Sequence, residues 1–189
     1  MAGSPDPLRY LLGYPAQVLA GVQVLIDEGR LAESIRQRYP QAHEVRNDRA
    51  LLEYVGELKA RHMRMAPPLA KVVYDPRLQL AHQALGTHTA VSRVQGSALK
   101  AKREIRIASL FKDAPAPFLH MIVVHELAHL KEREHGKAFY ALCQHMQGDY
   151  HQLEFDTRMW LTARELISRP DQQGSSARPG SGACGEPPA

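Results

Sequence analysis

The sequence predicts an α+β fold in which helices come first, a small, mainly antiparallel sheet follows, and further helices complete the domain. Three observations support this order. Apolar residues recur at helical spacing in the first third, short runs rich in Val, Ile and Thr occupy the middle, and apolar helical patterns return after residue 115. Helices and strands that are segregated along the chain in this way are typical of α+β domains.

The first predicted helix covers residues 15–38, and Pro40 ends it. Its apolar residues recur with the spacing of one helix face: Val18, Val22, Leu25 and Ile26. A second helix has Asn47 or Asp48 available as its N-cap and ends before Pro67. The first 66 residues are therefore predicted to be helical and to pack on the rest of the domain.

Strands are predicted where the helical pattern stops. Three short runs rich in β-branched residues mark them, at residues 71–74, 87–94 and 103–108. In the last run, Ile105 and Ile107 alternate with polar residues, as in a strand with one buried face. The helices that follow are predicted at residues 118–133, 137–146 and 151–167.

Composition sets the limits of the folded part and excludes some classes of protein. A chain of 189 residues suits one domain, and we place its main unit at residues 67–168. Gly, Pro and Ser make up more than half of residues 169–189, so this tail is expected to be disordered. No apolar run approaches the roughly 20 residues of a membrane span, and the start does not resemble a secretory signal, so we expect a cytoplasmic protein without a membrane partner.

The residues that indicate chemistry form an H-E-x-x-H motif. His125 and His129 are four residues apart, which puts them on one face of the predicted helix, where both imidazoles can bind one metal ion. Glu126 lies about 100° around the helix from His125, beside the metal, and can accept the proton of an attacking water. These residues predict zinc-dependent hydrolysis of peptide bonds, with one zinc ion per chain and Glu126 as general base.

A catalytic zinc ion normally has three protein ligands. His135 is the leading candidate for the third, because it follows His129 at the spacing found in related motifs. It reaches the metal only if the helix ends before residue 135, and Gly136 offers a break. Glu132 and Glu154 are the alternatives, the first on the face of the two histidines and the second from a later helix.

The motif and its surroundings resemble the YgjP-like zinc metallopeptidase family, relatives of the SprT and WLM zincin-like domains. The resemblance lies in residues 123–130 (VVHELAHL), 134–136 (EHG), 139–140 (FY), 149–150 (DY), 96–97 (GS) and 104–107 (EIRI). It implies a compact zincin-like fold in which His125, His129 and His135 bind zinc and Glu126 is the general base. It covers roughly residues 70–167.

Charge suggests an alternative function. The chain carries a net charge of +4, and residues 61–112 hold ten basic residues against two acidic ones. Such a run is usually a solvated face, but it can also bind nucleic acid, either in a non-hydrolytic protein or in a protease of DNA-bound proteins. The oligomeric state and the physiological substrate are not indicated by the sequence.

Several other residues near the motif could have a role in the site or only in packing. Packing or surface roles are favoured over a contact with an oxyanion for Tyr140, Tyr150 and His151. His120 and His145 are expected to be ordinary helix residues. Cys143 lies between Leu142 and Met146, which favours a place in the core.

Overall fold

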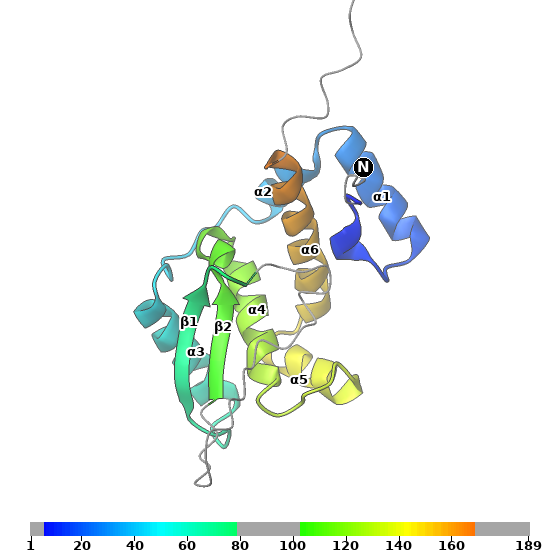
Figure 1. Cartoon of the computed structure of the whole chain (residues 1–189). Helices are drawn as coiled ribbons and strands as arrows, with labels where there is room; N and C mark the ends of the chain where they lie inside the picture. The colour runs from blue at the N-terminus through cyan, green and yellow to red at the C-terminus, as the bar shows by residue number, and fades with distance from the viewer. Residues whose placement is uncertain (1–5, 79–102, 169–189) are drawn as a thin grey trace, which may run out of the picture.

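The computed structural model describes residues 6–78 and 103–168 (Figure 1). Helices and a small sheet combine in an α+β arrangement, which confirms the predicted fold class. In chain order the elements are η1 (Arg9–Leu11), α1 (Ala16–Asp27), α2 (Leu31–Arg38), α3 (Asp48–His62), β1 (Leu69–Asp75), β2 (Arg103–Ala108), η2 (Ser109–Asp113), α4 (Ala116–Ala128), α5 (Lys137–Met146) and α6 (Tyr150–Ile167). The predicted strand at residues 87–94 and the tail at 169–189 lie outside the described residues.

The first predicted helix is two helices in the structure, because α1 ends at a glycine. Gly29 has a φ of +66°, a left-handed conformation that favours glycine. Its N–H donates to the carbonyl of Ile26, and the next N–H, of Arg30, donates to that of Leu25 at 2.9 Å. This is the Schellman pattern that ends helices. The chain therefore turns between α1 and α2, and a single helix over residues 15–38 was a wrong prediction.

Helix α3 begins at the predicted cap and is tied to the sheet. Asn47 precedes it in an extended conformation, and its side-chain oxygen accepts a hydrogen bond from the N–H of Ala50 at 2.9 Å. In the first turn, the Asp48 carboxylate accepts a hydrogen bond from the N–H of Tyr74 in β1, also at 2.9 Å. The N-terminal helical segment and the sheet thus share one hydrophobic core.

The two described strands run parallel, which corrects the prediction of a mainly antiparallel sheet. Val72 pairs with Ile105 and Tyr74 with Ile107, so both strands point the same way. A tight turn cannot join parallel neighbours, which need a crossover of about a dozen residues or more. Residues 76–102 are long enough for such a connection.

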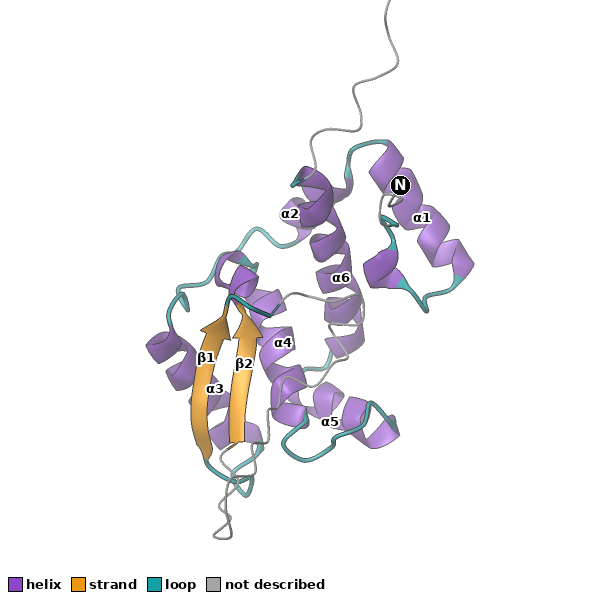
Figure 2. Ribbon diagram, in the orientation of Figure 1, coloured by secondary structure: helices purple, strands orange, loops and turns teal. Residues whose placement is uncertain are grey.

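Helix α4 is at the centre of the fold. Figure 2 shows it between the two strands and α6. From Phe118 onward every residue of α4 except His120 is buried, including the polar side chains of His125 and Glu126. A helix that is apolar on all sides is typical of the interior of a domain.

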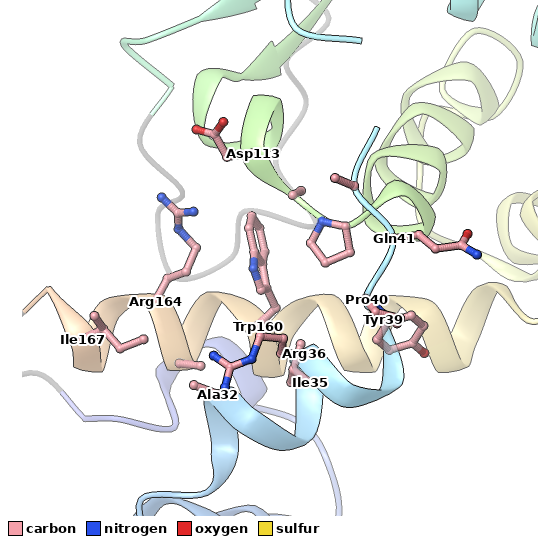
Figure 3. A pocket seen from close by; sticks show the side chains of 14 residues that line it. Ala32, Ile35, Arg36, Tyr39, Pro40, Gln41, Asp113, Trp160, Arg164 and Ile167 are labelled. Carbon is pink, nitrogen blue, oxygen red and sulfur yellow. The ribbon is translucent and has the colours of Figure 1, made fainter. Parts of the chain in front are cut away.

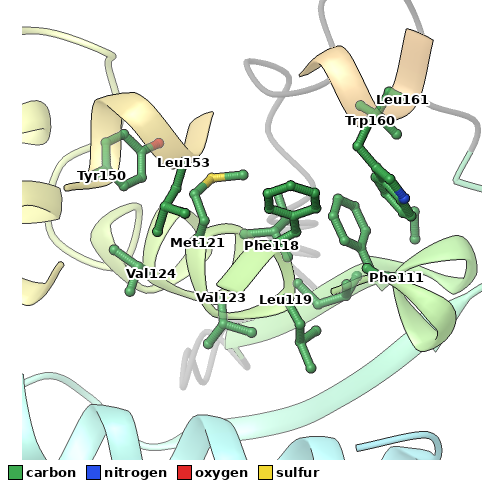
Figure 4. Packing of buried hydrophobic residues seen from close by; sticks show 14 of the residues in the cluster. Phe111, Phe118, Leu119, Met121, Val123, Val124, Tyr150, Leu153, Trp160 and Leu161 are labelled. Atoms are coloured by element: carbon green, nitrogen blue, oxygen red, sulfur yellow. The ribbon is translucent and has the colours of Figure 1, made fainter. Parts of the chain in front are cut away.

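Aromatic side chains, shown in Figure 4, and one buried carboxylate fix the helices around α4. The ring of Trp160 in α6 lies 5.6 Å from that of Phe111 and 5.8 Å from that of Phe118. One turn earlier in α6, the fully buried Asp156 accepts a hydrogen bond from the Tyr39 hydroxyl at 2.5 Å. Arg38 lies 3.2 Å from the same carboxylate, so α2 is held against α6. Within the described ranges, no helix combines the length and apolar character needed to cross a membrane.

Two adjacent leucines of α3 provide a matched test of this packing. Leu51 is fully buried, whereas Leu52 is 46% exposed. We expect Leu51→Ala to lower the free energy of unfolding by about 2 to 5 kcal/mol, because it leaves a cavity in the core. Leu52→Ala should change it by less than about 0.5 kcal/mol. Urea unfolding of both variants measures the difference, and equal losses would contradict the placement of α3.

Candidate metal centre

The H-E-x-x-H motif occupies the last turn of α4, and the helix ends as soon as the motif does. Ala128 is its last residue and His129 its C-cap. The N–H groups of Lys131 and Glu132 both donate to the carbonyl of Ala128, at 3.0 and 2.9 Å, so the chain turns here rather than continuing to residue 133 as predicted. Gly136 then begins α5 as its N-cap. The break that His135 requires is therefore present, five residues earlier than expected.

The turn brings three imidazoles together. The Nε2 atoms of His125 and His129 are 3.2 Å apart, and that of His135 lies 3.3 Å from the first and 3.1 Å from the second. Ligand nitrogens at 2.0 to 2.1 Å from a tetrahedral metal ion are separated by about 3.3 to 3.4 Å. The spacing of the three nitrogens thus fits a shared metal ion, and these residues form the one cluster of metal-ligand type found in the described ranges.

The opposite ring nitrogens of two histidines have partners of their own. Nδ1 of His125 lies 2.7 Å from the hydroxyl oxygen of Tyr150, and Nδ1 of His129 lies 3.0 Å from the carbonyl oxygen of Glu132. A proton on Nδ1, donated to these oxygens, leaves the lone pair of Nε2 for a metal ion. Such partners set both the tautomer and the orientation of a ligand histidine.

Tyr150 is the residue whose role sequence reasoning did not identify. It is fully buried at the start of α6. Burial raises the pKa of its hydroxyl above the ordinary value, and the nearby charge of Glu154 raises it further. The hydroxyl lies on the Nδ1 side of the His125 ring, opposite the nitrogen that faces the cluster, and it also interacts with the thiol of Cys143. Its position suits the orientation of the histidine more than contact with an oxyanion.

Phe139 forms the apolar wall of the cluster. This fully buried side chain of α5 has its ring centre 5.0 Å from that of His125, 4.6 Å from that of His129 and 4.7 Å from that of His135. Cys143, one turn further along α5, is also buried, as predicted, and burial raises its thiol pKa to about 12. The thiol therefore stays protonated at neutral pH.

Three glutamates near the site have different surroundings. Glu126 is buried on α4, 7% exposed, beside the histidines that precede and follow it in the motif. Glu154 accepts a hydrogen bond from Arg158 at 2.9 Å and forms an ion pair with it. Glu132 contributes its main-chain carbonyl to His129. Neither alternative third ligand is part of the three-residue cluster, whereas His135 is.

The other candidate side chains lie at the margin of the site or away from it. The rings of Tyr140 and His151 are 5.2 Å apart, and that of Tyr140 is 6.4 Å from His135. Nδ1 of His120 is 2.7 Å from the Tyr54 hydroxyl, on the side of α4 that faces α3. His145 is exposed and contacts another ring, that of His62.

A separate cavity of about 300 Å³ lies between α2, the C-terminal half of α6 and the start of α4 (Figure 3). Tyr39 and Trp160 line it together with Arg36 and Arg164. No histidine is among its lining residues. This cavity is therefore not part of the candidate metal centre.

The fold and the three-histidine cluster define the class of H-E-x-x-H metal-dependent hydrolases. A family model described as "YgjP-like, metallopeptidase domain" matches residues 21–158, so the chain belongs to the YgjP-like family, as its motif residues indicated. Among curated proteins, UTP pyrophosphatase of Escherichia coli (strain K12) is 58% identical over 159 residues, which are 84% of this chain and 95% of that protein. No solved structure matches the chain significantly.

The geometry of the cluster makes a prediction about the third ligand. We expect both His135→Ala and His129→Ala to abolish stoichiometric metal binding, because each variant removes one of three converging nitrogens. His145→Ala, an exposed histidine of the neighbouring helix, is the control and should keep its metal. Metal content is measured by elemental analysis of the purified proteins. Full metal content in His135→Ala would assign the third position to another residue.

A second prediction concerns the orientation of His125. Tyr150→Phe keeps the buried ring but removes the oxygen 2.7 Å from Nδ1. We expect it to weaken metal affinity by about 10- to 100-fold, the usual effect of losing such a partner. Competition with a chelator measures the affinity, and Tyr140→Phe serves as the control. An unchanged affinity would show that the hydroxyl does not orient the ligand.

Proposed function

We propose that this protein is a metal-dependent hydrolase that converts UTP to UMP and pyrophosphate. The observation that carries the proposal is the 58% identity to a UTP pyrophosphatase across 95% of that protein's length. The histidine cluster supports it, because metal ions assist the hydrolysis of phosphoryl as well as carbonyl compounds. We expect the reaction to take place in the cytoplasm.

Zinc is the metal we propose, one ion per chain, held by His125, His129 and His135. Three imidazole nitrogens at the observed spacing suit tetrahedral zinc, with one position left for water or substrate. When bound, zinc supplies a positive charge that polarises an oxygen of the scissile group and lowers the pKa of water. The hydrogen bonds of Tyr150 and of the Glu132 carbonyl hold the first two imidazoles in the orientation that this requires.

Glu126 is proposed as the general base. Its carboxylate accepts a proton from the water whose oxygen forms a bond to the α-phosphorus of UTP. The bond from this phosphorus to the bridging oxygen breaks, and pyrophosphate leaves with the electron pair. Glu126 and the neighbouring histidines are buried, which keeps bulk water away from the transferred proton. Because water is excluded, electrostatic interactions in the site are stronger.

Hydrolysis of peptide bonds is the second candidate function. The family description names a metallopeptidase domain, and the same histidines and glutamate suit attack on a carbonyl carbon. Here Glu126 accepts the proton of water and later returns it to the leaving amine. The two candidates share the metal centre and differ in the group that is held beside it.

Nucleic-acid binding by residues 61–112 stays a prediction. Within this segment, Arg106 forms ion pairs with Asp75 at 2.9 Å and with Glu104 at 3.0 Å, so part of the positive charge is neutralised in the sheet. Lys112 lies over the ring of Tyr74. Retention on DNA that falls steeply with salt would support this role.

The role of Glu126 gives a direct test of the proposed function. We expect the Glu126→Gln protein to keep its metal but to release UMP and pyrophosphate from UTP at least 100-fold more slowly, because general bases contribute about that much or more. Product formation is measured by phosphorus NMR, and metal content by elemental analysis. Glu132→Gln, whose main chain rather than side chain contacts His129, is the matched control and should remain active.

A comparison of substrates separates the two candidate functions. Wild-type protein is supplied in parallel with UTP and with a mixture of unstructured peptides. Cleavage of UTP alone supports the first function, and cleavage of peptides alone replaces it with the second. A Glu126→Gln protein that turns over both substrates at the wild-type rate would contradict the assignment of the base in either reaction.

A further inference from the structure

A second cavity, of about 550 Å³, lies where the end of α3, the start of β2 and the end of α4 meet. Its charged lining residues are all basic: Arg61, Arg64, Arg103 and Lys131. His62 and Leu142 contribute further parts of the wall. We call this space the basic pocket, and it is distinct from the cavity of Figure 3.

The basic pocket is connected to the histidine cluster along the chain, although His125, His129 and His135 are not among its lining residues. Leu130 and Lys131, which line it, directly follow His129. Since consecutive Cα atoms are about 3.8 Å apart, the wall begins within about 8 Å of the His129 backbone. Arg103 closes the connection, because its guanidinium donates to the carbonyl of Leu130 at 2.5 Å. The same turn therefore carries a histidine of the metal centre and a wall of the pocket.

The cations of the basic pocket differ in their pairing from the half-buried arginines elsewhere in the described part of the chain. Elsewhere, buried or half-buried arginines are paired: Arg9 with Glu165, Arg106 with Asp75 and Glu104, and Arg158 with Glu154. Within residues 6–78 and 103–168, none of the four basic side chains of the pocket forms an ion pair.

Like charges gathered in one cavity repel each other, and an anion relieves this repulsion. Arg64 and Arg103 each use a donor on a main-chain carbonyl, of Ala60 and Leu130, which holds the guanidinium in place. A guanidinium has five donors in a rigid fork, so most of each fork remains for a ligand. Forks of this kind match the oxygens of a phosphate group in pairs.

We propose that the basic pocket binds the polyphosphate chain of the nucleotide substrate. This inference rests on the proposed function, because it takes UTP as the substrate of the adjacent metal centre. The β- and γ-phosphates lie against Arg61, Arg64 and Lys131, which places the α-phosphorus toward the histidines. Such a pocket distinguishes a triphosphate from an uncharged peptide, and so it selects between the two chemistries that the metal centre permits.

The test compares two charge-matched double variants. Arg61→Gln/Arg64→Gln removes two exposed cations of the basic pocket, whereas Arg30→Gln/Arg49→Gln removes two exposed arginines from other surfaces. Both variants lower the net charge by the same amount, so a general electrostatic effect is shared. Inorganic tripolyphosphate is the probe, its binding to the metal-loaded protein is measured by calorimetry, and KM and kcat for UTP are measured alongside.

We expect the pocket variant to bind tripolyphosphate at least tenfold more weakly than the control variant and to show a raised KM for UTP. Equal affinities in the two variants, or no binding of tripolyphosphate to the wild type, would overturn the inference even if UTP is hydrolysed. Loss of tripolyphosphate binding in the pocket variant, together with no UTP hydrolysis by the wild type, would keep the pocket as a polyphosphate site and refute the proposed function.

Discussion

Three imidazole nitrogens about 3.2 Å apart, two at the end of the largely buried helix α4 and one in the segment that follows it, are the constraint around which this fold is arranged. Burial of polar groups is costly unless each has a partner. A shared metal ion would give partners to the inner nitrogens, and Tyr150 and the Glu132 carbonyl lie beside the outer nitrogens of His125 and His129. The turn after Ala128 then serves two ends, since it ends the helix and turns the third histidine back toward the others.

The elements packed around α4 hold this arrangement in place. Phe139 of α5 presses against all three imidazoles, and α6 brings Tyr150 from behind. Further along, α6 is joined to α2 through the buried Asp156 and to α4 through the aromatic contacts of Trp160. The orientation of the histidines therefore depends on a core that extends well beyond the motif.

The family description names a metallopeptidase domain, whereas the relative is named a UTP pyrophosphatase. The two names indicate different substrates for the same kind of metal centre. A metal ion and a carboxylate base assist attack on carbonyl carbon or on phosphorus, so the centre alone does not decide between them. The residues around the centre must therefore distinguish the substrates. They include the basic pocket, whose charged residues are all cations and form no ion pairs within the described part of the chain. Under the proposed function, the positive charge of this pocket is what favours a triphosphate over a peptide.

Local spacing by itself determined much of what this protein is. A separation of four residues puts His125 and His129 on one helix face, and Asn47 at a helix start predicts a cap, because both relations act within one turn of chain. Gly29 is a residue type that often ends a helix, but the helical spacing of the apolar residues before it favoured one continuous helix. The parallel pairing of β1 with β2, the contact between His125 and Tyr150, and the basic pocket were decided by the tertiary structure. Each joins residues that are far apart along the chain, and no local pattern records which distant partner the packing of the core will select.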